Sequence, residues 1–321
     1  MEWVTEAQKA LQESEASPEK TVKVGDIALR PVSSPLSTVD RIFNAEMDAL
    51  TIATGAEYAK TMYRDALKSG FYEFTKSRDW YVNVTADSGM HPEMLRKYIA
   101  RQVIQLTPIT PHWAEHIWKT VMGNSGSIMD LRWPTDLPSE QDYSLISVGE
   151  YIRKTVRSAR DAEIALQKRS KKSKGGSASG VDLSKPKALD IYVAHEFPAW
   201  QEEVIAALKA NFDAATGKFD DKKVLSTLGA NGMLKNKKVM PFAQEIKKRV
   251  ALTSVKALDR AVYFKEPELL AEILDYLKRT LEFDAVRVVD LANQSDLRED
   301  QAKAAESAVP GEPGFLIYNI E

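Results

Sequence analysis

The segment His112-Trp-Ala-Glu115-His116 has the residue types and spacing of a metal site. H-x-x-E-H is the signature of one class of zinc peptidases, in which both histidines bind the metal and the glutamate is the general base. The alternative is an amphipathic helix, because helical residues advance about 100° each. One side then holds apolar residues: Trp113, Ala114, Ile117, Trp118 and Val121. The other side holds polar ones: His112, Glu115, His116 and Lys119. We favour the helix and predict no metal site and no catalytic residue.

Basic side chains gather in two segments of a chain whose formal net charge is only −2. Residues 151–174 hold nine Lys/Arg against two acids, and residues 218–256 hold ten against three, a balance of +7 in each. Residues 282–321 have the opposite balance, with nine acids against three bases. Such local clusters predict the binding of anions, with solvated helix faces as the alternative.

The candidate phosphate-binding residues come from these two segments. In the first they are Lys168, Arg169, Lys171, Lys172 and Lys174, which have a rival role in a flexible tether. In the second they are Lys222, Lys223, Lys235, Lys237, Lys238, Lys247, Lys248 and Arg249. Lys237 and Lys238 precede an expected helix start, whose free N–H groups favour phosphate. Trp200 is expected to pack in the core rather than to stack on a ligand at the surface.

Composition excludes several other kinds of site. The chain has no cysteine, so it has no disulfide and no thiolate metal site. Neither G-x-x-x-x-G-K-[ST] nor G-x-G-x-x-G occurs, so no phosphate-binding glycine loop is indicated. No apolar run approaches 18 residues, and residues 1–20 are too acidic for a targeting peptide. We therefore expect no membrane segment and a cytoplasmic location.

Helical patterns dominate the first half of the chain. Ser37 or Thr38 is expected to cap a helix ending near Ala53, and a long helix is expected over 57–82. Further helices are predicted from Pro92, from Pro111 and over 148–168. In the long helix an apolar stripe recurs every four residues, with Leu67 and Phe71 beside it: Tyr58, Met62, Ala66, Gly70 and Phe74. Residues 127–146 are expected to pack on this bundle through Trp133.

The second half mixes strands and helices. Strands are predicted over 188–194, 285–291 and 314–321, and helices over 198–212, 221–229, 238–252 and 267–283. The predicted fold is thus mainly α, a helical bundle followed by a small α/β domain. We place the boundaries at 1–36 for a polar N-terminal segment, 37–167 for the bundle, 168–187 for a basic Gly/Ser linker and 188–321 for the α/β domain.

Several motifs, taken together and in order, resemble cytosolic leucyl-tRNA synthetases of the eukaryotic and archaeal type. They are 66–81, 89–118 and 127–134 in the first half, then 191–201, 216–229 and 237–248 in the second. The resemblance implies the anticodon-binding bundle of a class I synthetase followed by a C-terminal tRNA-binding appendage. No HIGH tetrapeptide occurs, and KRSKKSK at 168–174 follows the bundle, whereas the KMSKS loop of that family precedes it.

This resemblance implies the C-terminal part of a leucine–tRNA ligase. Such a part would position tRNA(Leu) for ATP-dependent leucylation by a catalytic domain that the chain lacks, so we expect it to be inactive alone and to start within a longer protein. ATP and Mg would belong to the full-length enzyme, and no cofactor to this chain. Expected partners are tRNA(Leu), the catalytic part of the synthetase and proteins that bind the C-terminal domain. The candidate residues of the two basic segments, from Lys168 to Lys174 and from Lys222 to Arg249, would be the tRNA-binding residues. The alternatives are a synthetase-derived protein-interaction module and the zinc peptidase.

Overall fold

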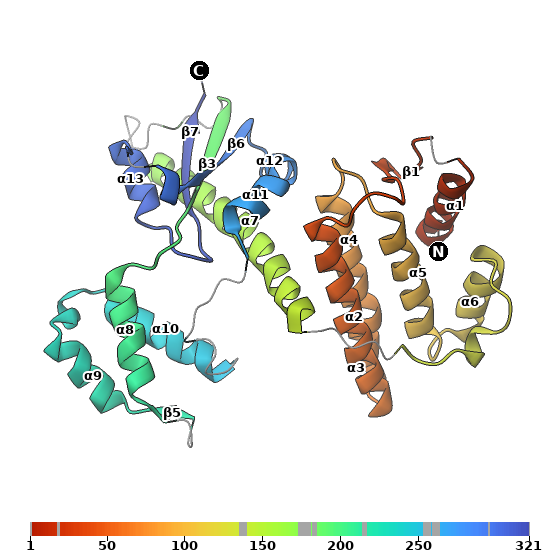
Figure 1. Cartoon of the computed structure of the whole chain (residues 1–321), viewed down its shortest axis with the longest axis horizontal. Coiled ribbons are helices and arrows are strands. Elements are labelled where there is room, and N and C mark those ends of the chain that lie inside the picture. Colours follow the sequence, from red (N-terminus) through yellow and green to blue (C-terminus); the bar gives the residue numbers. More distant parts are fainter. Residues whose placement is uncertain are drawn as a thin grey trace. The chain divides into compact units, whose positions relative to one another are not determined.

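The computed structural model describes residues 2–17, 20–134, 140–172, 181, 185–213, 217–252, 258, 264–294 and 296–320. The chain divides into two units (Figure 1). Unit 1 comprises Met1–Asp161 and Glu272–Phe283, and unit 2 comprises Ala162–Ala271 and Asp284–Glu321. Among the described residues, no helix is both long and apolar enough to cross a membrane.

Among its described residues, unit 1 consists of helices with short connections and a small antiparallel strand pair. The α-helices are α1 (Glu2–Ala16), α2 (Thr38–Ala59), α3 (Tyr63–Leu67), α4 (Phe74–Val84), α5 (Pro92–Leu106), α6 (Pro111–His116), the first part of α7 (Glu140–Lys172) and α12 (Leu274–Leu281). Two π-helices, η1 (Lys68–Glu73) and η2 (Ile117–Val121), and a 3-10 turn, η3 (Ile128–Asp130), complete the helical part. The strands are β1 (Lys23–Val24) and β2 (Ile27–Ala28). The helical bundle predicted for the first half is confirmed.

The start of α2 is fixed by a capping box at Ser37, one of the two N-cap residues expected from the sequence. Ser37 is the N-cap, its hydroxyl accepts the Asp40 N–H at 3.2 Å, and the Asp40 carboxylate accepts the Ser37 N–H at 2.7 Å. Asp40 is fully buried and also accepts hydrogen bonds from the Tyr81 hydroxyl, at 2.7 Å, and from the Arg30 guanidinium. This carboxylate therefore joins α2 to α4 and to the segment before α2.

The Tyr81 hydroxyl extends the same network to α5. It accepts the His91 N–H at 2.8 Å, and His91 is the N-cap of α5 through its Nδ1, which accepts the Glu93 N–H at 3.3 Å. Burial raises the pKa of Tyr81, so the phenol keeps the proton that it donates to Asp40. Burial alone would raise the pKa of Asp40, but the hydrogen bonds from Tyr81, Arg30 and Ser37 outweigh it and hold that pKa below its ordinary value.

The long helix expected over 57–82 is interrupted. Helix α2 continues to Ala59, and Thr61 then takes a left-handed conformation, with φ 57°, that ends it. The next helix runs from α3 through the π-turn η1 into α4. At Gly70 a Cβ would lie 2.7 Å from Thr54 Cγ2, so only glycine allows this close approach to α2. The expected apolar stripe is partly wrong, because Met62 is 45% exposed and neighbouring Phe71 is 36% exposed.

The N-terminal segment belongs to the core of unit 1. Its helix α1 buries Val4, Ala7, Ala10 and Leu11 and contacts α5, where Trp3 packs edge-on against Tyr98 at 5.7 Å. The predicted packing of Trp133 on the bundle is confirmed by its edge contact with Tyr58 at 5.8 Å. Gly55 makes room for this indole, because a Cβ there would lie 2.5 Å from Trp133 Nε1.

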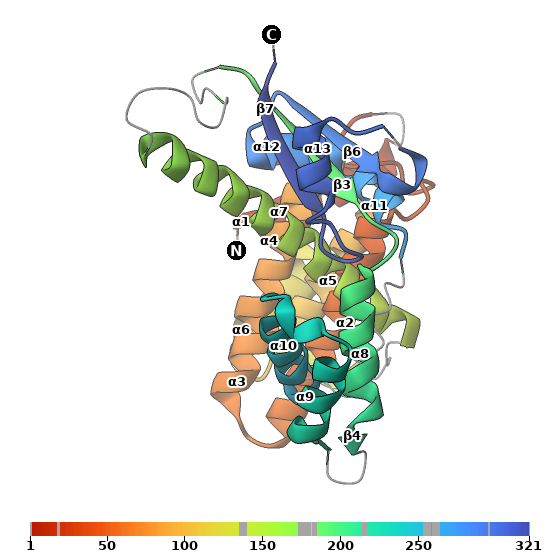
Figure 2. The same ribbon diagram turned by 90° about the vertical axis from the view of Figure 1, so that its left-hand side faces the viewer.

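Unit 2 contains a three-stranded sheet in the order β6-β3-β7. Strand β3 (Lys187–Val193) pairs parallel with β6 (Ala285–Asp290) and antiparallel with β7 (Gly314–Asn319). All three strands were predicted from the sequence. Helix α13 (Glu299–Ala305) covers one face of the sheet (Figure 2), where Tyr192 and Val289 pack against Ala304 and Ala308.

The other elements of unit 2 are mostly helical. They are α8 (Ala199–Ala210), β4 (Phe212–Asp213), β5 (Lys218–Phe219), α9 (Asp221–Ala230), the 3-10 turn η4 (Met233–Lys235), α10 (Val239–Leu252), most of α11 (Glu266–Glu272) and the 3-10 turn η6 (Leu291–Asn293). The single helix expected over 267–283 is wrong, because the backbone at Ile273, with φ −110° and ψ 18°, separates α11 from α12. The small α/β part is confirmed.

Removing the charge of Asp40 tests the network that joins α2, α4 and α5. We expect Asp40→Asn to lower the free energy of unfolding at pH 7 by roughly 2–4 kcal/mol, because Arg30 and Tyr81 lose a buried anionic partner. Urea denaturation would measure this. The matched control is Asp26→Asn, an exposed site where the change should be below about 0.5 kcal/mol.

The same variant predicts a pH dependence. Because the pKa of Asp40 is lower in the folded than in the unfolded chain, its stabilisation is present above the unfolded value and is lost as the pH falls below about 4. Wild type and Asp40→Asn should therefore converge in stability at acid pH. An equal difference at pH 7 and pH 3 would contradict this account of Asp40.

Candidate nucleic-acid interface

The second group of candidate residues lies on α9, η4 and α10 of unit 2 and in the turn between η4 and α10. Helix α9 begins at an N-cap, Asp220, whose carboxylate accepts the Lys223 N–H at 3.2 Å. Helix α10 begins at Val239, directly after Lys237 and Lys238, so the predicted helix start is confirmed. The Lys238 N–H donates to Asn236 Oδ1 at 3.0 Å.

A shared core holds these helices together. Val224 and Leu228 of α9 and Val239, Ala243 and Ile246 of α10 pack with Val204 and Leu208 of α8. Trp200 packs against this core and meets Phe242 at 5.3 Å, so the prediction that it is a packing residue is confirmed. The charged side chains consequently lie on the outer faces of a fixed set of helices.

These lysines differ in whether their ammonium groups form ion pairs and in how exposed they are. Lys247 is not free, since its ammonium lies 2.6 Å from Asp221 and its side chain is only 15% exposed. Lys223 is exposed and pairs with Asp220 at 3.3 Å. Within the described residues, the remaining lysines are exposed and make no ion pair: Lys222, Lys235, Lys237, Lys238 and Lys248. Arg249 lies in α10, and its side chain is outside the described residues.

The first group of candidate residues, Lys168 to Lys174, was expected in a linker, but its first part is helical. Helix α7 does not end at Lys168 but continues to Lys172, so the first residues of the expected linker are helical. Lys168 is exposed. The side chains of Arg169, Lys171 and Lys172, and the whole of Lys174, lie outside the described residues.

The H-x-x-E-H segment forms the two-sided helix predicted for it, as α6 continued by η2. Ala114 and Ile117 are fully buried, while His112 and His116 are exposed. Glu115 accepts the Ile128 N–H at 2.9 Å and the Ser127 hydroxyl at 3.0 Å, and pairs with Lys119 at 2.6 Å. The hydrogen bond from Lys119, followed by that from Ile128, lowers the pKa of Glu115. This carboxylate therefore holds η3 in place.

The part of the chain that the structure describes contains no cluster of metal-binding side chains. There, no three His, Asp or Glu residues lie close enough together to hold an ion.

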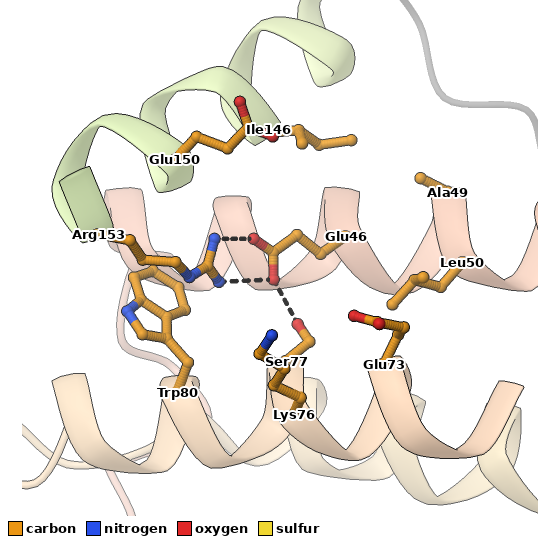
Figure 3. A pocket seen from close by; sticks show the side chains of 10 residues that line it. All are labelled: Glu46, Ala49, Leu50, Glu73, Lys76, Ser77, Trp80, Ile146, Glu150 and Arg153. Carbon is orange, nitrogen blue, oxygen red and sulfur yellow. Dashed lines mark hydrogen bonds and ion pairs between the residues drawn. The ribbon is translucent and has the colours of Figure 1, made fainter. Parts of the chain in front are cut away.

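A pocket of about 540 Å³ lies in unit 1 between α2, the η1–α4 helix and α7 (Figure 3). Arg153 forms a double ion pair with Glu46, at 2.7 and 3.0 Å, and lies 4.0 Å from the centre of the Trp80 ring. Ser77 donates a hydrogen bond to the same carboxylate. Glu73, Lys76 and Glu150 also line the pocket. Three carboxylates face two cations, a balance of −1, so the pocket does not favour phosphate.

Two family models match the chain. Residues 40–175 match the anticodon-binding domain of tRNA ligase, and residues 193–263 match the RagD-binding domain of leucine–tRNA ligase. The cytoplasmic leucine–tRNA ligase of Neurospora crassa is 36% identical over 297 residues, which are 88% of this chain and 26% of that protein. The chain belongs to the leucine–tRNA ligase family.

Two other relatives match a similar share of this chain and of their own length. The cytoplasmic leucine–tRNA ligase of Pongo abelii is 34% identical over 90% of this chain and 24% of its own length. A putative cytoplasmic leucine–tRNA ligase of Schizosaccharomyces pombe is 34% identical over 90% of this chain and 27% of its own length. The chain thus spans about a quarter of the length of these ligases.

The two groups of candidate residues fall in different family matches. Lys168 to Lys174 fall at the end of the anticodon-binding match, and all candidates from Lys222 to Arg249 fall inside the RagD-binding match. Sequence reasoning missed the Glu46–Arg153 pair, because 107 residues separate its partners and no local pattern links them.

A double-mutant cycle tests the Glu46–Arg153 pair. Glu46→Gln and Arg153→Gln should each lower the free energy of unfolding, and their coupling should be about 1–3 kcal/mol, because each change leaves the other group without its partner. Urea denaturation of the four proteins gives the coupling. Arg41→Gln, at an exposed position of α2, should change stability by less than about 0.5 kcal/mol. Additive effects would show that the pair contributes nothing.

Proposed function

We propose that the chain binds tRNA and positions leucine tRNA for leucylation by a catalytic domain outside it, in the cytoplasm. The observation that carries this proposal is the set of exposed, unpaired lysines on α9, η4 and α10, in a chain whose first half matches an anticodon-binding domain. ATP and Mg would act in the full-length ligase.

The lysine surface is suited to the sugar–phosphate backbone. Each phosphate that a lysine neutralises releases condensed counterions, so the affinity falls as salt rises. Contacts of this kind fix position rather than sequence, and the shape of the folded RNA then provides the selectivity. Lys247, which is held by Asp221, should contribute little.

A filter-binding titration with leucine tRNA against KCl tests the proposal. Four to six phosphate contacts predict a slope of log affinity against log salt of roughly −3 to −5. Lys237→Glu/Lys238→Glu should weaken binding and make the slope less steep by about 2. The control Lys9→Glu/Lys303→Glu changes the net charge equally at exposed sites outside this surface and should leave the slope unchanged. A flat titration, or equal slopes for all three proteins, would refute the proposal.

A second function is supported by a separate observation on the same elements. Residues 193–263 match a RagD-binding domain, and three large apolar side chains are exposed among the residues of this range that the structure describes: Leu225 on α9, Leu234 on η4 and Met240 on α10. Their exposed fractions are 47%, 44% and 37%. We propose that α8, α9 and α10 also bind a RagD protein, through these apolar groups.

A pull-down with purified RagD and nuclease treatment tests this second function. Binding should survive the nuclease, because the contact is direct, and Leu225→Glu/Leu234→Glu should reduce it at least tenfold by placing charges in an apolar contact. Met129→Glu, at a 59% exposed site in unit 1, is the control and should bind as wild type does. Loss of binding on nuclease treatment would show an RNA bridge instead.

A further inference from the structure

The pocket of about 540 Å³ in unit 1 has no role in either proposed function (Figure 3). Its volume lies within the range of about 300–1,000 Å³ that is usual for small-molecule sites. Three helical segments line it: α2, the continuous helix of η1 and α4, and the first part of α7. All of its lining residues belong to unit 1, so the pocket lies within that unit.

The lining side chains come from coherent faces of these helices. Residues four and seven positions apart lie on the same side of a helix. Two helices contribute residues with this spacing: Ile146, Glu150 and Arg153 on α7, and Glu73, Ser77 and Trp80 on η1 and α4. The pocket is therefore a product of helix packing rather than a gap beneath a loop.

The close approach of α7 to α2 fixes the frame of the pocket. Gly149 is buried, and a Cβ there would lie 2.8 Å from Ile42 Cγ2 and 3.1 Å from Glu46 Oε1. The double ion pair of Arg153 with Glu46, and the hydrogen bond that Ser77 donates to the same carboxylate, then connect all three helices. The pocket is thus formed before a ligand binds, which lowers the entropy cost of binding.

One part of the pocket is apolar. Figure 3 shows Ala49, Leu50 and Ile146 on one side of Glu46, and Arg153 with Trp80 on the other side. The three apolar side chains are only partly buried. A ligand that covers them removes apolar surface from water, so the pocket favours a ligand with an apolar body.

The pocket also contains charges without a partner. Glu46 and Arg153 neutralise each other, which leaves Glu73, Glu150 and Lys76, two acids against one base, or −1. Within the described residues, none of these three side chains makes an ion pair. Glu73 is half-buried, and its side chain points into the space between the helices (Figure 3). Its charge is therefore screened less by water than that of an exposed carboxylate.

We propose that this pocket binds a small organic cation with an apolar body, such as an arylalkyl amine. The ammonium group pairs with Glu73, the exposed Glu150 adds negative potential at the rim, and the apolar body covers Leu50 and Ile146. The site lies in unit 1, whereas the lysine surface lies in unit 2, and the proposal does not rest on the binding of tRNA.

Other classes of ligand fit the pocket less well. An anion would meet the excess of negative charge. A neutral apolar molecule would take the Glu73 carboxylate out of water without giving it a partner. A metal ion is disfavoured because, in the described part of the chain, no three His, Asp or Glu residues lie close enough together to hold one.

The experiment compares four probes in NMR titrations of the full chain at pH 7. The test probe is 2-phenylethylamine, which has both the cation and the apolar body. In 2-phenylethanol and 3-phenylpropionate a neutral group and an anion replace the cation, and ethylamine keeps the cation without the ring. Wild type should bind 2-phenylethylamine at one site and at least about tenfold more tightly than the other three, because the charge and the apolar body both contribute.

Three variants separate the causes. Glu73→Gln/Glu150→Gln should bind 2-phenylethylamine no more tightly than 2-phenylethanol, because the amides carry no charge, while its affinity for 2-phenylethanol should not fall. Retained binding of the alcohol shows that the pocket still folds. Lys76→Gln removes a repelling cation and should tighten binding of the amine about threefold. The control Asp26→Asn/Glu203→Gln removes two exposed carboxylates outside the pocket and should bind as wild type does.

Two results would overturn the assignment of this pocket. One is the same affinity of wild type for 2-phenylethylamine and 2-phenylethanol, or no saturable binding of the amine at all. The other is an unchanged affinity for the amine in Glu73→Gln/Glu150→Gln. Neither result bears on the tRNA proposal, which the salt titration tests separately.

Discussion

The buried carboxylate of Asp40 is the interaction on which the rest of unit 1 depends. A buried charge is stable only if hydrogen bonds and an opposite charge compensate it, and Asp40 receives both from Ser37, Tyr81 and Arg30. Tyr81 then accepts the N–H of His91 at the start of α5. One carboxylate thus fixes where α2 begins, how α4 lies against it and where α5 starts. The pocket of Figure 3 is lined by α2 and α4, which this carboxylate joins, and by α7.

Sequence predicted those elements whose signals are local. Ser37 before α2, and Pro92 after His91, mark helix starts locally. The three strands are rich in apolar, mostly branched residues, although Asp190 interrupts β3 and Arg287 interrupts β6. The π-turn η1 was not predicted, and its Gly70 packs closely against Thr54, a contact between separate helices that no local pattern indicates. The packing of helix α1 was not predicted for this polar segment, since the apolar side of the helix is buried only by its contact with α5.

The candidate site shows the same division between local and distant signals. The clustering of lysines is visible in the sequence, but which charges remain free is not, because Asp221 reaches Lys247 across 26 positions. Phe71 was assigned beside an apolar stripe from its spacing, yet the π-turn places it at the surface. Glu115 has the spacing of a catalytic base, but the backbone of Ile128 and the hydroxyl of Ser127 occupy it.

The central claim of this account is that the lysines of α9, η4 and α10 contact RNA. Hydrogen-exchange mass spectrometry of the full chain, with and without leucine tRNA, tests it most directly, because slower exchange reports where the backbone is held. The account predicts slower exchange in Asp221–Ala230 and Val239–Leu252, and no change in Pro111–Val121. Slower exchange confined to Pro111–Val121, or to none of these segments, would contradict it.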